Sequence, residues 1–247
     1  MTEKKKVALC IGAGDGIGAG FVRRFAAGGY TTVIGRREPE KSAGLIGEIE
    51  AAGGAAQAFS VDARLEESVA ELFQTVEQDI GPVETCLYNA GANYQNNVED
   101  ITPEMFEKVW RLGCYGGFLT GREAAKYMVP RGRGCILYTG ATASLRGRAN
   151  FGAFASAKSG LRAFAQSLAR ELGPKGVHVT HLIMDGGVDS AVIHARRRAR
   201  AVDEDLTFPP DSLMSLESIG EAYWMLAQQR RDAWTFKLDI RPFVEAW

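Results

Sequence analysis

Residues 7–18 read Val-Ala-Leu-Cys-Ile-Gly-Ala-Gly-Asp-Gly-Ile-Gly, and this stretch decides the fold. Its first five residues are a short apolar run, and its glycines lead into residues 19–27, which have the composition and spacing of a helix. Backbone N–H groups at a helix N-terminus favour an anion, because they lack partners and the helix dipole is positive there. Glycine also lets the backbone turn tightly and approach a ligand closely. A strand–glycine–helix unit in this position therefore predicts a pyrophosphate site rather than a plain turn.

The rest of the chain alternates short apolar runs with longer segments of helical period. The sequence predicts strands over residues 31–34, 58–61, 85–88, 135–138, 177–184 and 234–240. It predicts helices over residues 45–52, 65–79, 103–127 and 155–172. Such alternation is typical of parallel βαβ units. We therefore expect an α/β fold, with a single Rossmann-like doubly wound domain over residues 1–247 and a parallel sheet flanked by helices.

Composition excludes several classes of function. The net charge of −1 argues against general nucleic-acid or anionic-membrane binding. No apolar run reaches the roughly 20 residues that a membrane-spanning helix needs. The four cysteines are widely spaced and form no Cys-x-x-Cys pair, so buried free thiols are expected and a metal site is not. We expect a cytoplasmic protein with neither nucleic acid nor membrane as a partner.

Several motifs resemble those of the classical short-chain dehydrogenase/reductase superfamily, and they occur in its order. They are Gly12-x-x-x-Gly16-x-Gly18, Asp62 after a short strand, Asn89-Ala90-Gly91, a lysine at position 158, and the segment 185–190, Asp-Gly-Gly-Val-Asp-Ser. The resemblance covers essentially the whole chain and implies a nicotinamide cofactor. The cofactor contacts that it implies are Gly12, Gly14, Asp15, Gly16, Ile17, Gly18, Arg36, Arg37, Asp62, Ala63, Asn89, Ala90, Gly91, Lys158, Gly186, Val188 and Ser190.

The residues after the second predicted strand bear on the choice of cofactor. An acidic side chain at this strand end would bind the ribose hydroxyls of NAD and repel a 2′-phosphate. Here Gly35 is followed by Arg36 and Arg37, and arginine can bind a phosphate bidentately. NADP(H) is therefore favoured, while NAD(H) stays open because Asp15 adds a negative charge to the glycine loop.

The resemblance also implies four catalytic positions, and three of them lack their usual side chain. Lys158 is retained, but Phe154 stands at the tyrosine position, Ala141 at the serine position and Gly113 at the asparagine position. A general acid contributes roughly 10²–10⁴-fold in rate, so ordinary carbonyl reduction should almost disappear without a replacement. Gly113, Gly116 and Gly117 indicate close packing of a helix against its surroundings.

Other groups are candidates for the missing chemistry. Thr142 and Ser144 could replace the serine, although ordinary loop hydroxyls are the simpler interpretation. Lys158 could act as an acid if burial lowered its pKa. The tyrosines that could supply a phenol from another position are Tyr94, Tyr115 and Tyr138.

Two functions are therefore compatible with the sequence. The first is an NAD(P)(H)-dependent oxidoreductase that acts on a carbonyl or hydroxyl of an unknown small molecule with an atypical active site. The alternative is a catalytically inactive nucleotide-binding, regulatory or scaffold protein. The resemblance implies a substrate lid around residues 188–215, whose basic run at 194–200 could attract an anion, and a homodimer or homotetramer.

Overall fold

The computed structural model describes residues 6–198, 209 and 211–245. Seven parallel strands form one sheet in the order β3-β2-β1-β4-β5-β6-β7. Their bounds are β1 (Val7–Ile11), β2 (Thr31–Arg36), β3 (Ala55–Ser60), β4 (Val83–Tyr88), β5 (Gly134–Ala141), β6 (Val177–Met184) and β7 (Lys237–Ile240). The predicted α/β fold is confirmed.

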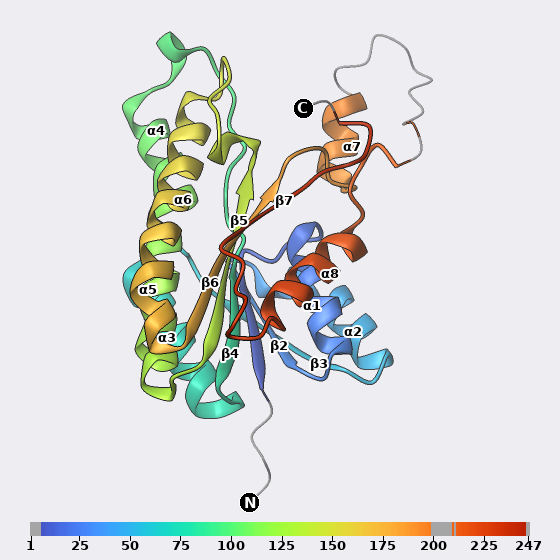
Figure 1. Ribbon diagram of the computed structural model, residues 1–247. Helices are drawn as coiled ribbons and strands as arrows, with labels where there is room; N and C mark the ends of the chain where they lie inside the picture. Colours follow the sequence, from blue (N-terminus) through green and yellow to red (C-terminus); the bar gives the residue numbers. More distant parts are fainter. Residues whose placement is uncertain (1–5, 199–208, 210, 246–247) are drawn as a thin grey trace, which may run out of the picture.

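Helices cover both faces of the sheet (Figure 1). One layer consists of α1 (Ile17–Ala27), α2 (Ala43–Ala51) and α8 (Leu216–Ala227). The other consists of α3 (Glu66–Thr75), α4 (Pro103–Trp110), α5 (Gly116–Arg131) and α6 (Gly152–Leu172). Each layer buries its own apolar core against the sheet. The last helix, α7 (Ala191–Arg198), lies beyond the carboxyl end of β6.

The strand predicted over residues 177–184 coincides with β6, whereas the helix predicted over residues 103–127 is interrupted. A π-helical turn, Arg111–Tyr115, separates α4 from α5. The glycines of this region allow close packing within the chain: a Cβ built on Gly117 would collide with Leu161 of α6, and one on Gly116 with Tyr88 of β4. A second π-helical turn, Val76–Ile80, follows α3. No prediction delimited α8, which packs against α1 through Gly20 and Gly220.

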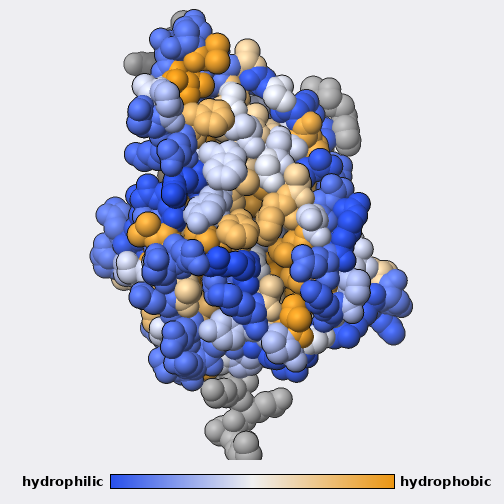
Figure 2. Space-filling view, turned by 90° about the vertical axis from the view of Figure 1, so that its left-hand side faces the viewer, coloured by the Kyte–Doolittle hydropathy of each residue, from blue (hydrophilic) through white to orange (hydrophobic). Residues whose placement is uncertain are grey.

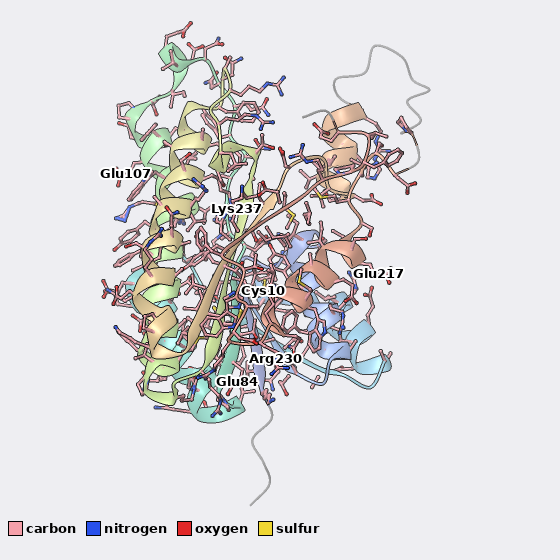
Figure 3. All side chains as sticks on the ribbon, viewed as in Figure 1. Cys10, Glu84, Glu107, Glu217, Arg230 and Lys237 are labelled. Atoms are coloured by element: carbon pink, nitrogen blue, oxygen red, sulfur yellow. The ribbon has the colours of Figure 1, made fainter. Side chains whose placement is uncertain are left out.

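The topology determines where a ligand can bind. Chain connections leave β1 in opposite directions, because β1 pairs with β2 on one side and β4 on the other. Open α/β sheets bind ligands beyond the carboxyl ends of the strands at such a switch point. Cys10 of β1 lies deep in the interior, while Glu107 and Glu217 lie on opposite sides of the molecule (Figure 3). All four cysteines are buried free thiols, as predicted. Within the described residues, no helix has the length and apolar character needed to cross a membrane.

Candidate active site

A cavity of about 1240 Å³ lies at the carboxyl edge of the sheet. It is lined by the glycine loop after β1, by the ends of β2, β4, β5 and β6, and by residues of α6 and α7. All the predicted cofactor residues line it except Gly18, which is buried behind the loop, where an added Cβ would lie 2.5 Å from Ala13 Cα. Sequence positions from 11 to 245 are thus brought together around one space.

The glycine loop leaves open backbone next to an uncapped helix N-terminus. Gly12 has φ +90°, and a Cβ there would collide with the backbone of Ala90. A Cβ on Gly14, by contrast, would meet no atom within 4 Å, so this residue faces open space in the cavity. The N-cap of α1 is Gly16, and no side chain caps this helix. The first N–H groups of α1 are therefore available to an anion.

The end of β2 is basic and has no room for an acidic side chain at position 35. A Cβ on Gly35 would lie 2.9 Å from Val61 Cγ1 and 3.1 Å from Leu72 Cδ2. Arg36 and Arg37 line the cavity just beyond it. This arrangement favours a phosphate over a bare ribose hydroxyl pair at this end of the cavity.

The carboxylate of Asp62 is engaged by its neighbour. Arg64 donates from Nε at 2.9 Å and from Nη2 at 2.5 Å, and its backbone N–H also binds Asp62 Oδ1. The side-chain hydrogen bond from Arg64 lowers the pKa of Asp62 despite partial burial. Arg64, which the sequence analysis did not single out, also lines the cavity, and its guanidinium occupies the carboxylate of Asp62, a predicted cofactor contact.

One hydrogen-bond network ties Lys158 to the glycine loop. Lys158 Nζ donates to Thr139 O at 2.7 Å, and Thr139 Oγ1 donates to Asn89 Oδ1 at 2.9 Å. Asn89 Nδ2 in turn donates to Gly12 O at 2.8 Å. Tyr223 of α8 joins the network through a 2.7 Å contact between its hydroxyl and Thr139 Oγ1. The sequence analysis did not predict a role for Thr139 or Tyr223. For Thr139, the one available signal was a polar residue near the end of an otherwise apolar strand.

Burial changes the acidity of Lys158. Its side chain is 5% exposed, and desolvation lowers its pKa from 10.5 to about 8. Lys158 still lines the cavity, and a Cβ on Gly91 would lie 3.4 Å from its Nζ. The ammonium is therefore poised to lose or regain a proton close to neutral pH.

Phe154 lies one helical turn before Lys158, lines the same cavity and is 9% exposed. Ala141, at the end of β5, also lines the cavity. Gly113 does not, because it is packed against α6: a Cβ there would lie 2.7 Å from Ala157 Cβ. The position that would hold an asparagine thus has no room for one, and closer helix packing has taken its place.

The two substitute hydroxyls have different surroundings. Ser144 is buried, does not line the cavity, and its Oγ accepts a 3.1 Å hydrogen bond from the Ala141 N–H, so it holds the loop. Thr142 lines the cavity and donates to Asp185 Oδ1 at 2.5 Å. Arg241 Nη2 binds the other oxygen of Asp185 at 2.6 Å. This buried hydroxyl–carboxylate–guanidinium chain was not predicted, since its members are far apart in sequence.

Of the three alternative tyrosines, only Tyr94 lines the cavity. Its hydroxyl accepts a 3.1 Å hydrogen bond from Asn96 Nδ2. Tyr138 is fully buried in the core, donates to Gly117 O at 3.2 Å, and has its pKa raised by desolvation. Tyr115 packs against Trp110 and Phe118 instead. Neither Tyr115 nor Tyr138 is positioned to protonate a substrate.

The segment 185–190, which contains three of the predicted cofactor contacts, is held to Met214. Val188 pairs with Met214 in an isolated bridge, and Met214 N–H donates to Gly187 O at 2.9 Å. These contacts close the base of the segment predicted as the lid, residues 188–215. Positions 199–208 and 210, and with them the last two residues of the basic run 194–200, lie outside the described residues. His194 of that run contacts Asp189 Oδ1 through Nε2 at 2.6 Å.

Comparison with known proteins gives a consistent result. The sequence model of short chain dehydrogenases matches residues 6–201. A crystal structure of a short-chain dehydrogenase from Rhodopseudomonas palustris is 44% identical, with a TM-score of 0.82 over 96% of this chain and 99% of the other. The bovine 3-oxoacyl-[acyl-carrier-protein] reductase is 30% identical over 179 residues, which are 70% of this chain and 72% of the reductase. Actinorhodin polyketide ketoreductase with NADPH has a TM-score of 0.88 at 21% identity, over 98% of each chain, which is a likeness of fold.

Proposed function

Because the chain belongs to the short-chain dehydrogenase family, whose members are oxidoreductases, we propose that it is an NADP(H)-dependent oxidoreductase acting on a carbonyl or hydroxyl of a small molecule. The observation that carries this proposal is the network from Lys158 through Thr139 and Asn89 to Gly12, which joins the retained lysine to a pyrophosphate-shaped loop. A chain that only needed the fold would have no reason to keep a buried ammonium at the cavity wall, since burying it is costly.

The preference for NADP(H) rests on Arg36 and Arg37 beside a glycine that excludes any acidic side chain. Proteins of the same fold point in this direction. One is a metagenomic short-chain oxidoreductase in complex with NADP, and another is an alcohol dehydrogenase from Thermococcus sibiricus complexed with 5-hydroxy-NADP. The two are 23% and 24% identical to this chain, so they support the proposal by analogy only.

Lys158 is the group we assign to proton transfer in place of the missing tyrosine. A bound nicotinamide would supply the hydride. The ammonium of Lys158 would then hold its proton at Nζ, release it to the oxygen of the reduced carbonyl, and take one up from solvent. A pKa of about 8 suits this role, because general acids work best when their pKa is close to the operating pH. Tyr94, the one cavity tyrosine of the three considered, is the competing donor.

The first experiment is calorimetric titration with NADPH, NADP⁺, NADH and NAD⁺ in parallel, followed by a panel of ketones, aldehydes and alcohols. We expect a phosphorylated cofactor to bind at least about tenfold more tightly than its NAD counterpart. We also expect turnover that is lost in Lys158→Met and retained in Tyr94→Phe. Turnover retained in Lys158→Met would remove Lys158 from the proton-transfer role.

The second candidate function is nucleotide binding without turnover, and Phe154, Ala141 and Gly113 favour it. It predicts tight cofactor binding with no hydride transfer to any substrate. A double variant, Phe154→Tyr with Ala141→Ser, separates the candidates, because both positions line the cavity. Activity that appears only in the double variant would favour the non-catalytic protein. Gly113→Asn is unsuitable for this test, since Ala157 occupies the space that the side chain would need.

We also propose a homodimer or homotetramer, in the cytoplasm, assembled through the face of α4, α5 and α6. Apolar and aromatic side chains run through the middle of this face, with charged residues on both sides (Figure 2). Phe106 and Trp110 of α4 are 42% and 38% exposed, which is unusual for such large side chains on a monomer surface. Light scattering of the wild-type protein and of Trp110→Glu would test this surface.

A further inference from the structure

The end of the cavity near Phe154 and Lys158, the reacting end, carries more positive than negative charge, although the chain as a whole has a net charge of −1. The loop after β5 contributes Arg146 and Arg148, and α4 contributes Lys108. All three line the cavity, and both α4 and the turn after β5 pack against α6, which carries Phe154, whereas Arg36 and Arg37 belong to the end of β2. These cations are not among the predicted cofactor contacts, and they take no part in the hydrogen-bond network of Lys158.

The acidic groups that line the cavity near these cations offset their charge only in part. Asp185 is already bound by Arg241 at 2.6 Å and by Thr142 at 2.5 Å. Arg146 Nη2 stays 3.8 Å from Asp185 Oδ1, which is too far for a hydrogen bond, and its side chain is 57% exposed. Glu245 of the C-terminal segment is the remaining acid that lines this end.

Lys108 and Arg148 have still fewer partners. Among the described residues, no carboxylate lies within 4 Å of the Lys108 ammonium or of the Arg148 guanidinium. Both residues are exposed at the cavity mouth. Their donors are therefore free for a ligand, and a guanidinium binds a carboxylate or phosphate through two parallel hydrogen bonds.

We infer that Arg146, Arg148 and Lys108 form a subsite for an oxyanion on the substrate, so that the substrate is a small ketone or secondary alcohol bearing a carboxylate or phosphate. This inference rests on the proposed function for the reacting carbon, but the subsite itself does not depend on it. The same cavity also has apolar lining residues, which suit a hydrocarbon ring or chain that links the oxyanion to the reacting carbon. They are Met105, Val109, Leu112, Phe151 and Phe154.

The subsite differs from the anion site considered for the basic run at 194–200. That run belongs to the segment predicted as the lid, whereas Arg146 and Arg148 follow β5, the strand that ends at the serine position, Ala141. An oxyanion held there would lie in the same cavity as Lys158. The two cations would therefore orient the substrate as well as attract it.

A binding experiment tests the subsite without requiring turnover. Benzoate, benzamide and phenyl phosphate are titrated into the full-length protein and into Arg146→Gln/Arg148→Gln. Arg170→Gln, an exposed arginine of α6 away from the cavity, is the matched surface control. Arg36→Gln reports any binding at the nucleotide end. We expect benzoate or phenyl phosphate to bind at least about tenfold more tightly than benzamide, and this preference to disappear only in the double variant.

The two anionic probes distinguish a carboxylate substrate from a phosphate substrate. Equal binding of benzoate, phenyl phosphate and benzamide, or anion binding that survives the double variant, would overturn the inference. So would anion binding lost in Arg36→Gln alone, since that would assign it to the nucleotide end.

Turnover provides a second readout where the proposed function holds. A cyclic keto acid and its methyl ester are compared as substrates, and the acid-to-ester ratio of kcat/KM is expected to fall at least about tenfold in Arg146→Gln/Arg148→Gln, mainly through KM. An unchanged ratio contradicts the subsite. Absence of turnover on any substrate contradicts the proposed oxidoreductase instead, while the benzoate titration still reports on the subsite.

Discussion

The two ends of the cavity use different parts of the chain. We call the end beside the glycine loop the nucleotide end and the end beside Lys158 the reacting end. The nucleotide end is made largely of backbone: a positive-φ glycine at Gly12, an open glycine at Gly14 and the uncapped start of α1. The reacting end depends on side chains, and there Phe154 and Ala141 stand where the family resemblance implies a tyrosine and a serine. A binding site made of backbone survives many substitutions, whereas a proton-transfer site can be lost with a single one. This difference explains how a chain can keep the backbone of the family's predicted cofactor site while it lacks the family's usual proton donor.

The reacting end keeps ordered polar contacts, although it lacks three of the side chains that the family resemblance implies. Lys158 is buried, hydrogen-bonded and connected to the glycine loop, and Thr142, Asp185 and Arg241 form an ordered chain beside Ala141. A site without any role would have no need to retain two separate buried charges.

The largest effect is expected for Gly12→Ala at the nucleotide end. Its Cβ would collide with the Ala90 backbone, and φ +90° is strained for alanine, so the loop cannot keep its shape. We expect complete loss of cofactor binding together with a lower melting temperature. Gly14→Ala is the matched control: it meets no protein atom within 4 Å, so stability should be unchanged and only cofactor affinity should fall. If Gly14→Ala leaves cofactor affinity intact, the cofactor does not approach the loop at this point.

The same contrast explains what the sequence could predict. Glycine spacing, strand periodicity and motif order are local signals, and they predicted the parallel sheet. The predicted cofactor contacts stay a prediction, but most of them follow the carboxyl ends of parallel strands, and the fold brings these ends to one cavity.

Contacts between distant parts of the chain were not predictable in this way. Arg241 comes 56 residues after Asp185, and Tyr223 lies 84 residues from Thr139, so no pattern in the sequence marks either pair. The reason for glycine at position 113 also appears only in three dimensions, where Ala157 of another helix fills the space. The helices predicted over residues 65–79 and 103–127 did not include the π-helical turns, because one extra residue in a single turn hardly changes the spacing of apolar residues.

The second prediction concerns Lys158→Met at the reacting end. Methionine fills a similar volume without a charge, so relief of the desolvation cost should offset the lost hydrogen bond to Thr139 O, and thermal stability should change little. Turnover should fall roughly 10²–10⁴-fold because the proton donor is gone. Steady-state kinetics and thermal unfolding are measured on the same preparation, so that a folding defect is not mistaken for lost chemistry. A variant that retains at least half of the wild-type kcat would exclude Lys158 as the acid.

The third prediction is a pH profile that identifies the donor. Burial lowers the pKa of Lys158 to about 8, so its ammonium is present below that pH and is lost above it. The reductive kcat should therefore be level below about pH 8 and fall about tenfold per pH unit above it. The oxidative kcat should rise up to the same pH and then level off, because the neutral amine is needed to accept the proton. A reductive rate that stays level to about pH 9.5 contradicts Lys158 as the donor and directs attention to Tyr94.

The smallest effect on cofactor binding is expected for Arg36→Gln at the nucleotide end. In the proposed function side chains, rather than backbone, discriminate between cofactors, so loss of one of them should change preference without removing binding. We expect the NADPH affinity to fall about 10- to 100-fold, the range for losing one charge-assisted contact, while NADH affinity stays unchanged. Arg23→Gln, an exposed α1 arginine paired with Glu48 away from the cavity, controls for the change in net charge. Equal losses for NADPH and NADH would mean that Arg36 supports the loop instead of reading the 2′-phosphate, and the nucleotide end would then owe its specificity to Arg37 alone.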